Sequence, residues 1–517
     1  MRGGGKIILY TTVFVCGIST MGVELSASRL LAPFFGTSLY VWTNIIGIIM
    51  VSLTIGYFIG GRISDKHPDT TLFYTITLTA GILIGVIPFL SSFILPLATK
   101  ALSTLSYNDF LLSFAGSLLL FAIPIALLGA IIPFAVRLNI KKLENSGKTS
   151  GRIYAVSTLG SIIGVYLPAL LLIPTIGTRF TIIGFSLLLI AVSSIALLIT
   201  TLKGVFKKTF FSAIIICFVF TSIVLIPHTI SSEKDVIYEG ESPYYYLKIR
   251  QINDTRYLLA NQGRGVWSKN IQGKAFTGRY WDYLVVGAAF NNDTKNVLII
   301  GLAAGTTAKS FTVAYPNVTI DGVEIDPLVI KIGKKYFNMT YHNLHPIVAD
   351  GRLFVKTTQN KYDVIVLDVY KDLTIPYHMT TKEFFQEVKK ILQPDGILEI
   401  NVAAGHGTKI LKILGNTLLQ VFPKVYVVKV PNSYNYILFA EKNQRNLNNI
   451  KEKIMEKRDT IPFSIQCLKE DRLTLKSVFT EAALTIEEFH TTSSIYFTDD
   501  YAPVEEIIGF DAFFPTT

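Results

Sequence analysis

The hydrophobic residues of this chain are concentrated in its first half. Seven apolar runs there are each long enough to cross the hydrocarbon core of a membrane, which takes roughly 17 to 25 residues as a helix. Beyond Pro227 the long runs stop and the sequence becomes that of an ordinary globular domain. We therefore predict a multi-pass helical membrane domain over residues 1–230. Its helices are expected near Ile7–Leu31, Leu39–Gly60, Leu72–Leu95, Phe110–Val136, Ile153–Pro174, Phe180–Leu202 and Thr209–Pro227.

Two kinds of residue stand out inside these apolar runs: small residues and charged residues. Small residues, as in Ser157–Gly164, let neighbouring helices approach closely. Glu24 and Arg29 lie within the first run, where a charge is costly and usually faces a partner or a wet cavity. Either they form a polar site for a cationic substrate, or they are a structural pair or residues at the membrane surface. The sequence leaves both interpretations open.

From Asn296 onward, apolar runs with strand character alternate with helical patterns. This alternation is typical of a parallel sheet with helices on its faces. Helical patterns cover Pro327–Phe337 and Thr381–Leu392. Five strands joined by crossovers and then a closing hairpin predict an α/β class I methyltransferase-like Rossmann domain over residues 291–517. The strands are expected at Asn296–Ile300, Val318–Val323, Pro346–Val348, Val364–Leu367, Ile397–Val402, Val425–Val430 and Tyr436–Ala440.

A smaller β-rich segment precedes this sheet. The stretches Tyr244–Ile252 and Arg256–Ala260 have the pattern of a β-hairpin around Asn253–Asp254. We predict a small N-terminal β cap over residues 231–290.

The most informative polar residues follow the first three predicted strands, at the edge of the sheet where ligands bind. The first strand enters a tight turn, in which Gly301 and Gly305 would let the backbone approach a ligand, although such spacing is equally common in packing. The second strand ends at Glu324, where a carboxylate can accept hydrogen bonds from a ribose diol. The third ends at Asp350 and Gly351, where a carboxylate can bind an adenine amino group. The set predicts a nucleoside site, and the tighter glycine fingerprint of a dinucleotide dehydrogenase is not evident.

Asp368 follows the fourth strand, beyond the residues that the nucleoside needs. A carboxylate there is suited to hold and deprotonate an incoming amine, although a helix-capping or loop aspartate is the alternative. Aromatic residues could form the wall of a site for a cation, or they could belong to the core. They are Tyr244, Tyr245, Tyr246, Tyr280, Trp281 and Tyr283.

Composition narrows the classes of function. The 517 residues are 50% hydrophobic and 16% charged, and much of the +11 net charge lies in short loops between the apolar runs. Basic loops of this kind reflect membrane topology, so we expect no nucleic-acid partner. The three cysteines are too scattered for a disulfide framework or a zinc site, and the seven histidines lack metal-ligand spacing. We therefore expect no metal.

Several motifs, taken together, resemble the spermidine synthase (polyamine aminopropyltransferase) family. The resemblance covers about residues 230–510 and is strongest to the branch fused to an N-terminal multi-pass membrane region. The motifs are Glu241–Tyr245, Thr277–Tyr283, Val297–Gly305, Val323–Asp326, Ala349–Gly351, Tyr362–Tyr370, Ile375–His378 and Thr498–Glu505.

The resemblance implies a role for each matching residue. Asp368 matches the proton-accepting aspartate, Glu324 the ribose ligand, and Asp350 with Gly351 the adenine site. Glycines 301 and 305 belong to the nucleoside-binding turn. Tyr245 stands where the family commonly has a nucleoside-contacting glutamine.

The residues on the amine side depart from the family pattern. Trp281, next to Tyr280, replaces a polyamine-contacting histidine. Ala304 replaces the aspartate that usually holds the substrate's ammonium group. Tyr370 begins the stretch that replaces the family's Thr-Asp-Pro sequence, in which a second acidic residue is expected.

The resemblance implies a membrane-bound aminopropyltransferase that uses decarboxylated S-adenosylmethionine as co-substrate and an amine such as putrescine as acceptor, without a cofactor. Two alternatives stay open: a methyl- or alkyltransferase that uses intact S-adenosylmethionine, and a polyamine transporter or sensor with a ligand-binding Rossmann domain. Membrane lipid is an expected partner, and homodimer formation stays open.

Two observations point to opposite orientations of the soluble domain. With a cytoplasmic N-terminus, the inner loops hold twelve Lys or Arg residues and the outer loops hold two, Lys100 and Arg179. This positive-inside bias, with seven crossings, would place the soluble domain outside. An S-adenosyl nucleoside is a cytosolic metabolite, however. We give more weight to the cytosolic supply of this nucleoside than to the loop charges. We therefore predict a cell-membrane protein with a cytoplasmic soluble domain.

Overall fold

The computed structural model describes residues 3–507 apart from 103–108, 141–142, 201–233, 262, 264, 292, 405–407, 466 and 492. The chain divides into two compact units. The first comprises Met1–Lys234 and Glu239–Leu247, and the second comprises Asp235–Tyr238 and Lys248–Thr517. Each unit has a hydrophobic core of its own.

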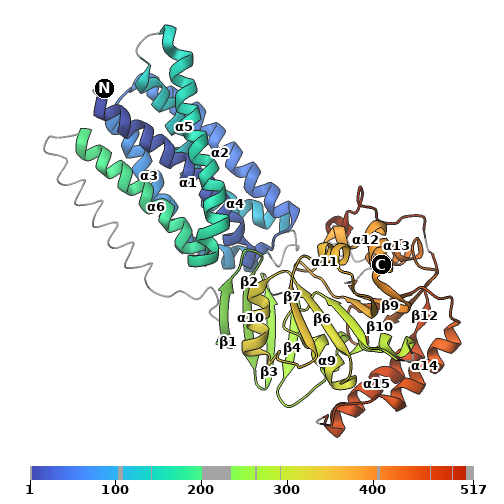
Figure 1. The fold of residues 1–517 in the computed structure, drawn as a ribbon. Helices are drawn as coiled ribbons and strands as arrows, with labels where there is room; N and C mark the ends of the chain where they lie inside the picture. Colours follow the sequence, from blue (N-terminus) through green and yellow to red (C-terminus); the bar gives the residue numbers. More distant parts are fainter. Residues whose placement is uncertain are drawn as a thin grey trace. The chain divides into compact units, whose positions relative to one another are not determined.

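The first unit is a bundle of long apolar helices (Figure 1). Within the described residues, five helical stretches are long and apolar enough to cross a membrane, judged by length and composition. The predicted run Thr209–Pro227 lies outside the described residues, so the number of seven stays a prediction. The helices are α1 (Gly3–Phe35), α2 (Leu39–Lys66), α3 (Thr70–Leu102), α4 (Asp109–Asn139), the 3-10 turn η1 (Leu143–Asn145), α5 (Ser146–Leu167), the π-helical η2 (Pro168–Leu172) and α6 (Ile173–Thr200).

The last of the five stretches, Ser146–Ile199, is 54 residues long and contains the fifth predicted run and most of the sixth. It is broken at Gly177, whose φ of 81° and ψ of 166° are not helical. The part before this kink packs against α1, and the part after it packs against α3 and α1. Because both parts contact α1, the kink divides the stretch into two helices of the same bundle.

The small residues of α5 do bring helices close together, as the sequence predicts. A Cβ atom added to Gly160 would lie 2.2 Å from the carbonyl oxygen of Phe14, and one added to Gly164 would lie 2.2 Å from that of Ile18. No side chain fits at such distances, so glycine at these two positions allows the backbones of α1 and α5 to touch.

A four-stranded sheet in the order β1-β2-β3-β4 follows the bundle in sequence. The predicted turn at Asn253 lies between β2 and β3, with a left-handed φ of 50° at this residue. The boundary between the two units falls within this segment, at Leu247, so a separate cap domain over 231–290 stays a prediction. The strands are β1 (Val236–Glu241), β2 (Tyr246–Ile252), β3 (Thr255–Ala260) and β4 (Val266–Ile271).

An eight-stranded mixed sheet forms the centre of the second unit, in the order β12-β10-β11-β9-β8-β5-β6-β7 (Figure 1). Strands β7, β6, β5, β8 and β9 are parallel to one another. Beyond them, β11 pairs antiparallel with β9, β10 pairs antiparallel with β11, and β12 pairs antiparallel with β10. This is the Rossmann-like, methyltransferase-type sheet that the sequence predicts. The strands are β5 (Asn296–Ile300), β6 (Thr319–Glu324), β7 (Leu344–Val348), β8 (Tyr362–Leu367), β9 (Leu392–Ala403), β10 (Lys424–Lys429), β11 (Asn435–Glu441) and β12 (Glu487–Glu488).

Both faces of this sheet are buried, which explains why its strands read as continuous apolar runs. Side chains alternate along β5, so that Val297 and Ile299 join one core cluster and Leu298 and Ile300 join the other. Helices cover both faces. They are α8 (Tyr280–Tyr283), η3 (Val286–Phe290), α9 (Thr306–Ala314), α10 (Pro327–Tyr336), α11 (Gly351–Thr357), η4 (Tyr377–Met379), α12 (Lys382–Ile391), α13 (Lys409–Leu419), α14 (Leu447–Thr460) and α15 (Lys469–Thr485).

Candidate active site

The first element of the candidate site is the turn after β5. Gly301 has a φ of 90°, and a Cβ atom added to it would lie 2.3 Å from the carbonyl oxygen of Asp368. Gly305 has a φ of 84° at the start of α9, and a Cβ there would lie 2.6 Å from the side chain of Met339. Both glycines are therefore required by close packing within the protein. Their contact with a nucleoside stays a prediction.

Glu324, at the end of β6, is buried and ties the strand ends together. Its carboxylate accepts hydrogen bonds from the backbone N–H of Ala303 at 3.0 Å and of Asp326 at 3.2 Å. Burial raises the pKa of this carboxyl group to about 7, although the backbone donors oppose the shift. The carboxyl group is thus fixed beside the β5 turn, and its predicted contact with a ribose stays a prediction.

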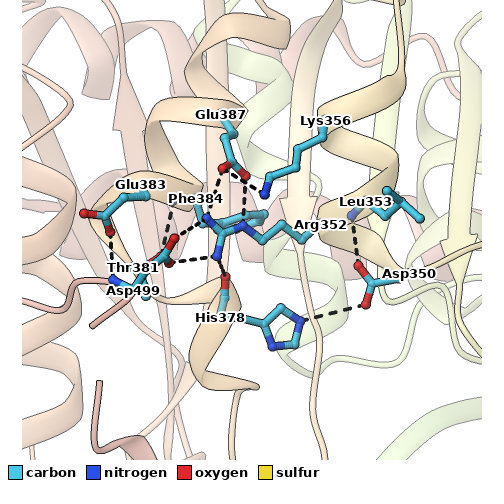
Figure 2. Close-up of polar contacts among 10 residues, drawn as sticks. All are labelled: Asp350, Arg352, Leu353, Lys356, His378, Thr381, Glu383, Phe384, Glu387 and Asp499. Carbon is cyan, nitrogen blue, oxygen red and sulfur yellow. Dashed lines mark hydrogen bonds and ion pairs between the residues drawn. The ribbon is translucent and has the colours of Figure 1, made fainter. Parts of the chain in front are cut away.

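Asp350 stands immediately before α11 and caps it. Its Oδ1 accepts the backbone N–H of Leu353 at 2.9 Å, and its Oδ2 lies 3.9 Å from Nε2 of His378 (Figure 2). One oxygen of this carboxylate therefore caps the helix. The other oxygen faces His378, which the sequence analysis did not propose as a site residue. Gly351 fits tightly, because a Cβ atom there would lie 2.5 Å from Ile300.

Asp368, at the end of β8, is buried and hydrogen-bonded. Its Oδ1 accepts a hydrogen bond of 2.8 Å from Nδ2 of Asn401, and its side chain also bonds to that of Tyr280. Burial raises the pKa of this carboxyl group to about 6, and the two hydrogen bonds limit the rise. A carboxylate of this pKa is ionised at neutral pH and can still accept a proton, which suits a general base.

Asn401 is a site residue that sequence reasoning missed. It lies on β9 and its Oδ1 accepts a hydrogen bond of 2.8 Å from Asn435, which in turn accepts one of 2.5 Å from Ser433. The chain of bonds orients the Asn401 amide so that its N–H points at Asp368. The signal in the sequence was a single polar residue within the apolar run Ile397–Val402.

Of the four residues expected on the amine side, Tyr280 and Tyr370 adjoin this carboxylate, and Trp281 packs against Tyr280. Tyr280 bonds to Asp368, and its ring lies 4.3 Å from that of Trp281 between centroids. Tyr370 donates its hydroxyl to the carbonyl of Asn401 at 2.9 Å. The fourth, Ala304, is buried, and its N–H donates to Ser268 at 2.9 Å.

The loop that carries Tyr280 and Trp281 is fixed by a buried carboxylate, Asp282. It accepts hydrogen bonds from the backbone N–H groups of Thr277 at 2.8 Å and Gly278 at 2.6 Å. Burial raises the pKa of Asp282 to about 6. These bonds hold the turn that begins α8.

Two of the other aromatic residues have core positions. Tyr283 belongs to the hydrophobic core, which is one of the two interpretations that the sequence left open, and it donates to Glu481 at 2.9 Å. Tyr246 is also buried, at 6% exposure. Tyr245 lies in a turn closed by Ser242 and belongs to the first unit, so its nucleoside contact stays a prediction.

A protein-family model described as "Spermine/spermidine synthase domain" matches residues 282–453. The "Polyamine aminopropyltransferase" of Vibrio vulnificus (strain CMCP6) is 30% identical over 227 residues, which are 42% of this chain and 75% of that protein. The chain belongs to the spermine/spermidine synthase family. Members of this family are aminopropyltransferase enzymes.

This spermine/spermidine synthase family member is also similar to a second aminopropyl transferase and, over a shorter stretch, to a methyltransferase. The "Probable polyamine aminopropyl transferase" of Bifidobacterium longum (strain NCC 2705) is 32% identical over 291 residues, and the match spans 54% of this chain and 64% of that protein. The "eEF1A lysine and N-terminal methyltransferase" of Xenopus laevis is 31% identical over 159 residues, or 29% of this chain and 23% of that protein.

Among the described residues of this family member, no group of three or more His, Cys, Asp or Glu side chains is arranged to hold a metal ion.

Proposed function

We propose that this protein is a membrane-bound aminopropyltransferase that moves an aminopropyl group from decarboxylated S-adenosylmethionine to an amine such as putrescine. The observation that carries the proposal is Asp368, a buried carboxylate with a pKa of about 6 at the strand end beside the predicted nucleoside residues. Membership of the spermine/spermidine synthase family supports the same reaction.

The reaction needs one base and little else. The amine nitrogen attacks the propyl carbon bound to the sulfonium, the carbon–sulfur bond breaks, and its electron pair stays on sulfur to give methylthioadenosine. The proton that the incoming ammonium must lose before its nitrogen can attack goes to Asp368. A positioned base of this kind typically contributes ~100- to 10,000-fold to the rate.

The remaining residues have binding roles in this proposal. Glu324 binds the ribose, and Asp350 and Gly351 bind the adenine. Tyr280 and Trp281 offer aromatic faces to the substrate cation, an attraction worth roughly 0.5 to 2 kcal/mol depending on how far the cation is desolvated. Gly301 and Gly305 complete the nucleoside side, and Ala304 and Tyr370 complete the amine side.

A second function, methyl transfer from intact S-adenosylmethionine, is favoured by one specific observation. Ala304 stands where an aspartate would hold the aminopropyl ammonium, and part of the chain is similar to a methyltransferase. The opposing argument is electrostatic. The donor carboxylate of intact S-adenosylmethionine would lie near Asp368, and burying it without a partner would cost several kcal/mol.

The location proposed for this chemistry is the cytoplasmic face of the cell membrane. Five helical stretches of sufficient length and apolar composition support a membrane location. The supply of S-adenosyl nucleosides in the cytosol supports the orientation.

Product analysis tests the proposed function. The purified full-length protein in detergent is incubated with each donor and a panel of amines, and the products are identified by mass spectrometry. We expect methylthioadenosine and an amine lengthened by one aminopropyl unit, only with the decarboxylated donor. S-adenosylhomocysteine and a methylated product would contradict aminopropyl transfer, and no turnover with either donor would favour a ligand-binding sensor. The Asp368→Asn variant serves as the catalytically impaired control.

A further inference from the structure

Arg352 is the most heavily bonded cation in the described part of the second unit's ligand-binding edge. It lies on α11, two residues after Asp350, and is 9% exposed. All five guanidinium N–H groups have acceptors (Figure 2). Glu387 accepts from Nε and Nη2, each at 2.9 Å, Asp499 accepts from Nη1 and Nη2, each at 2.8 Å, and the carbonyl of His378 accepts from Nη1 at 2.9 Å.

These bonds join four segments that are distant in sequence. Arg352 belongs to α11, His378 to η4 and Glu387 to α12. Asp499 belongs to the C-terminal motif, 147 residues away from Arg352. Two carboxylates on one guanidinium in bidentate geometry form the strongest kind of charged hydrogen bonding available to side chains. The pKa of Asp499 is accordingly lowered, mainly by its bond to Arg352.

Asp499 is itself held in place by two further bonds. Its Oδ1 accepts the hydroxyl of Thr381 at 2.6 Å, and its backbone N–H donates to Glu383 at 2.9 Å. The turn around it is closed by an antiparallel bridge between Thr498 and Tyr501. The carboxylate of Asp499 is therefore a fixed point against which Arg352 is aligned.

Arg352, Glu387 and Asp499 together form a clamp, which acts on the surroundings of Asp350 from two sides. Arg352 fixes the short helix α11, whose first residues follow Asp350 directly. It also bonds to the backbone of His378, whose ring faces Oδ2 of Asp350. The start of α11 has little freedom to adjust by itself, since a Cβ atom on Gly351 would lie 2.8 Å from Met379 in η4.

We propose that Asp499 acts through Arg352 as a positioning residue for the adenine end of the nucleoside site. Asp499 holds Arg352, and Arg352 holds Asp350 and His378 in the geometry that binds the base. The inference rests on the proposed function in placing the adenine at Asp350. It assigns a role in substrate binding to the C-terminal motif Thr498–Glu505, through the bonds between Asp499 and Arg352.

The test separates binding from turnover. The dissociation constant of methylthioadenosine is measured by calorimetry on the full-length protein in detergent, together with kcat at saturating donor and the thermal unfolding midpoint without ligand. Asp499→Asn keeps the size of the side chain and removes its charge. We expect its dissociation constant to rise about tenfold, which corresponds to about 1.4 kcal/mol. We expect kcat to stay within about twofold, because Asp368 is untouched.

The matched control is Asp500→Asn, which changes the neighbouring exposed aspartate of the same motif and should leave all three quantities unchanged. Arg352→Gln and the double variant complete a cycle, in which the two changes should be far from additive. If Asp499→Asn does not fold, Glu383→Ala removes only the acceptor of the Asp499 N–H. The Glu383→Ala variant should then bind the nucleoside about two- to threefold more weakly, as expected for the loss of one modest hydrogen bond.

Three outcomes would overturn the inference. An unchanged dissociation constant in Asp499→Asn would do so, as would a lower unfolding midpoint accompanied by unchanged binding, which indicates a purely structural clamp. Additive effects in the cycle would show that Asp499 does not act through Arg352. A wild-type protein that does not bind methylthioadenosine would instead contradict the proposed function, on which the inference depends.

Discussion

Replacement of Asn401 by leucine should raise the pH at which the enzyme becomes active. The change removes one of the two hydrogen bonds that stabilise the ionised form of Asp368, while leucine keeps a similar volume on β9. The general base works only when it is ionised. Activity therefore falls as the pH drops through the pKa of Asp368, and a higher pKa moves this fall to higher pH.

The magnitude follows from the strength of the lost bond. A hydrogen bond to a charged group contributes ~1.5 to 3 kcal/mol, and one pKa unit corresponds to about 1.4 kcal/mol. The pKa of Asp368 should therefore rise from about 6 by roughly one to two units. At pH 7 the ionised fraction would fall from about nine-tenths to between about one-half and one-tenth, a two- to ninefold loss of kcat that disappears near pH 9.

The assay is the pH profile of kcat between pH 5 and about 9.5 with saturating donor and amine. Asn435→Leu should shift the same limb by a smaller amount, because it removes the bond that orients the Asn401 amide. Asn443→Leu is the control, since Asn443 donates to Asp395 in an exposed contact. A profile for Asn401→Leu that is lowered equally at every pH would refute the assignment of the acidic limb to Asp368.

Four further predictions concern the same protein. Asp368→Asn should lower kcat ~100- to 10,000-fold while methylthioadenosine still binds, and near-normal turnover would exclude it as the base. Glu324→Gln should do the opposite and mainly raise the KM of the donor, which steady-state kinetics with varied donor would detect. Calorimetry should show tighter binding of decarboxylated than of intact S-adenosylmethionine, and the reverse order would favour the methyltransferase. In sealed cells, added protease should spare the Lys331–Lys335 segment and should cut it in inverted vesicles; cleavage in intact cells would place the soluble domain outside.

Periodicity was sufficient to predict the sheet, and residue chemistry was sufficient to propose a site at its edge. The apolar runs of β5 and β8 are local patterns, and local patterns fix the type and order of parallel strands. Because the carboxyl ends of such strands meet at one edge, the carboxylates of Glu324, Asp350 and Asp368 could be assigned to one site without a structure. The helical bundle was likewise predictable from run length, although the kink at Gly177 and its effect on the helices were not visible in hydropathy.

The connections among side chains could be determined only from the tertiary structure. Asn401 meets Asp368 because β8 and β9 are adjacent in register, and Asn435 reaches Asn401 from the neighbouring β11. Arg352 meets Asp499 although 147 residues separate them. Such pairs leave no periodic trace in the sequence, since each partner alone resembles an ordinary polar residue. The sequence by itself therefore determined which groups carry the proposed chemistry, and the packing of distant segments decided what holds those groups in place.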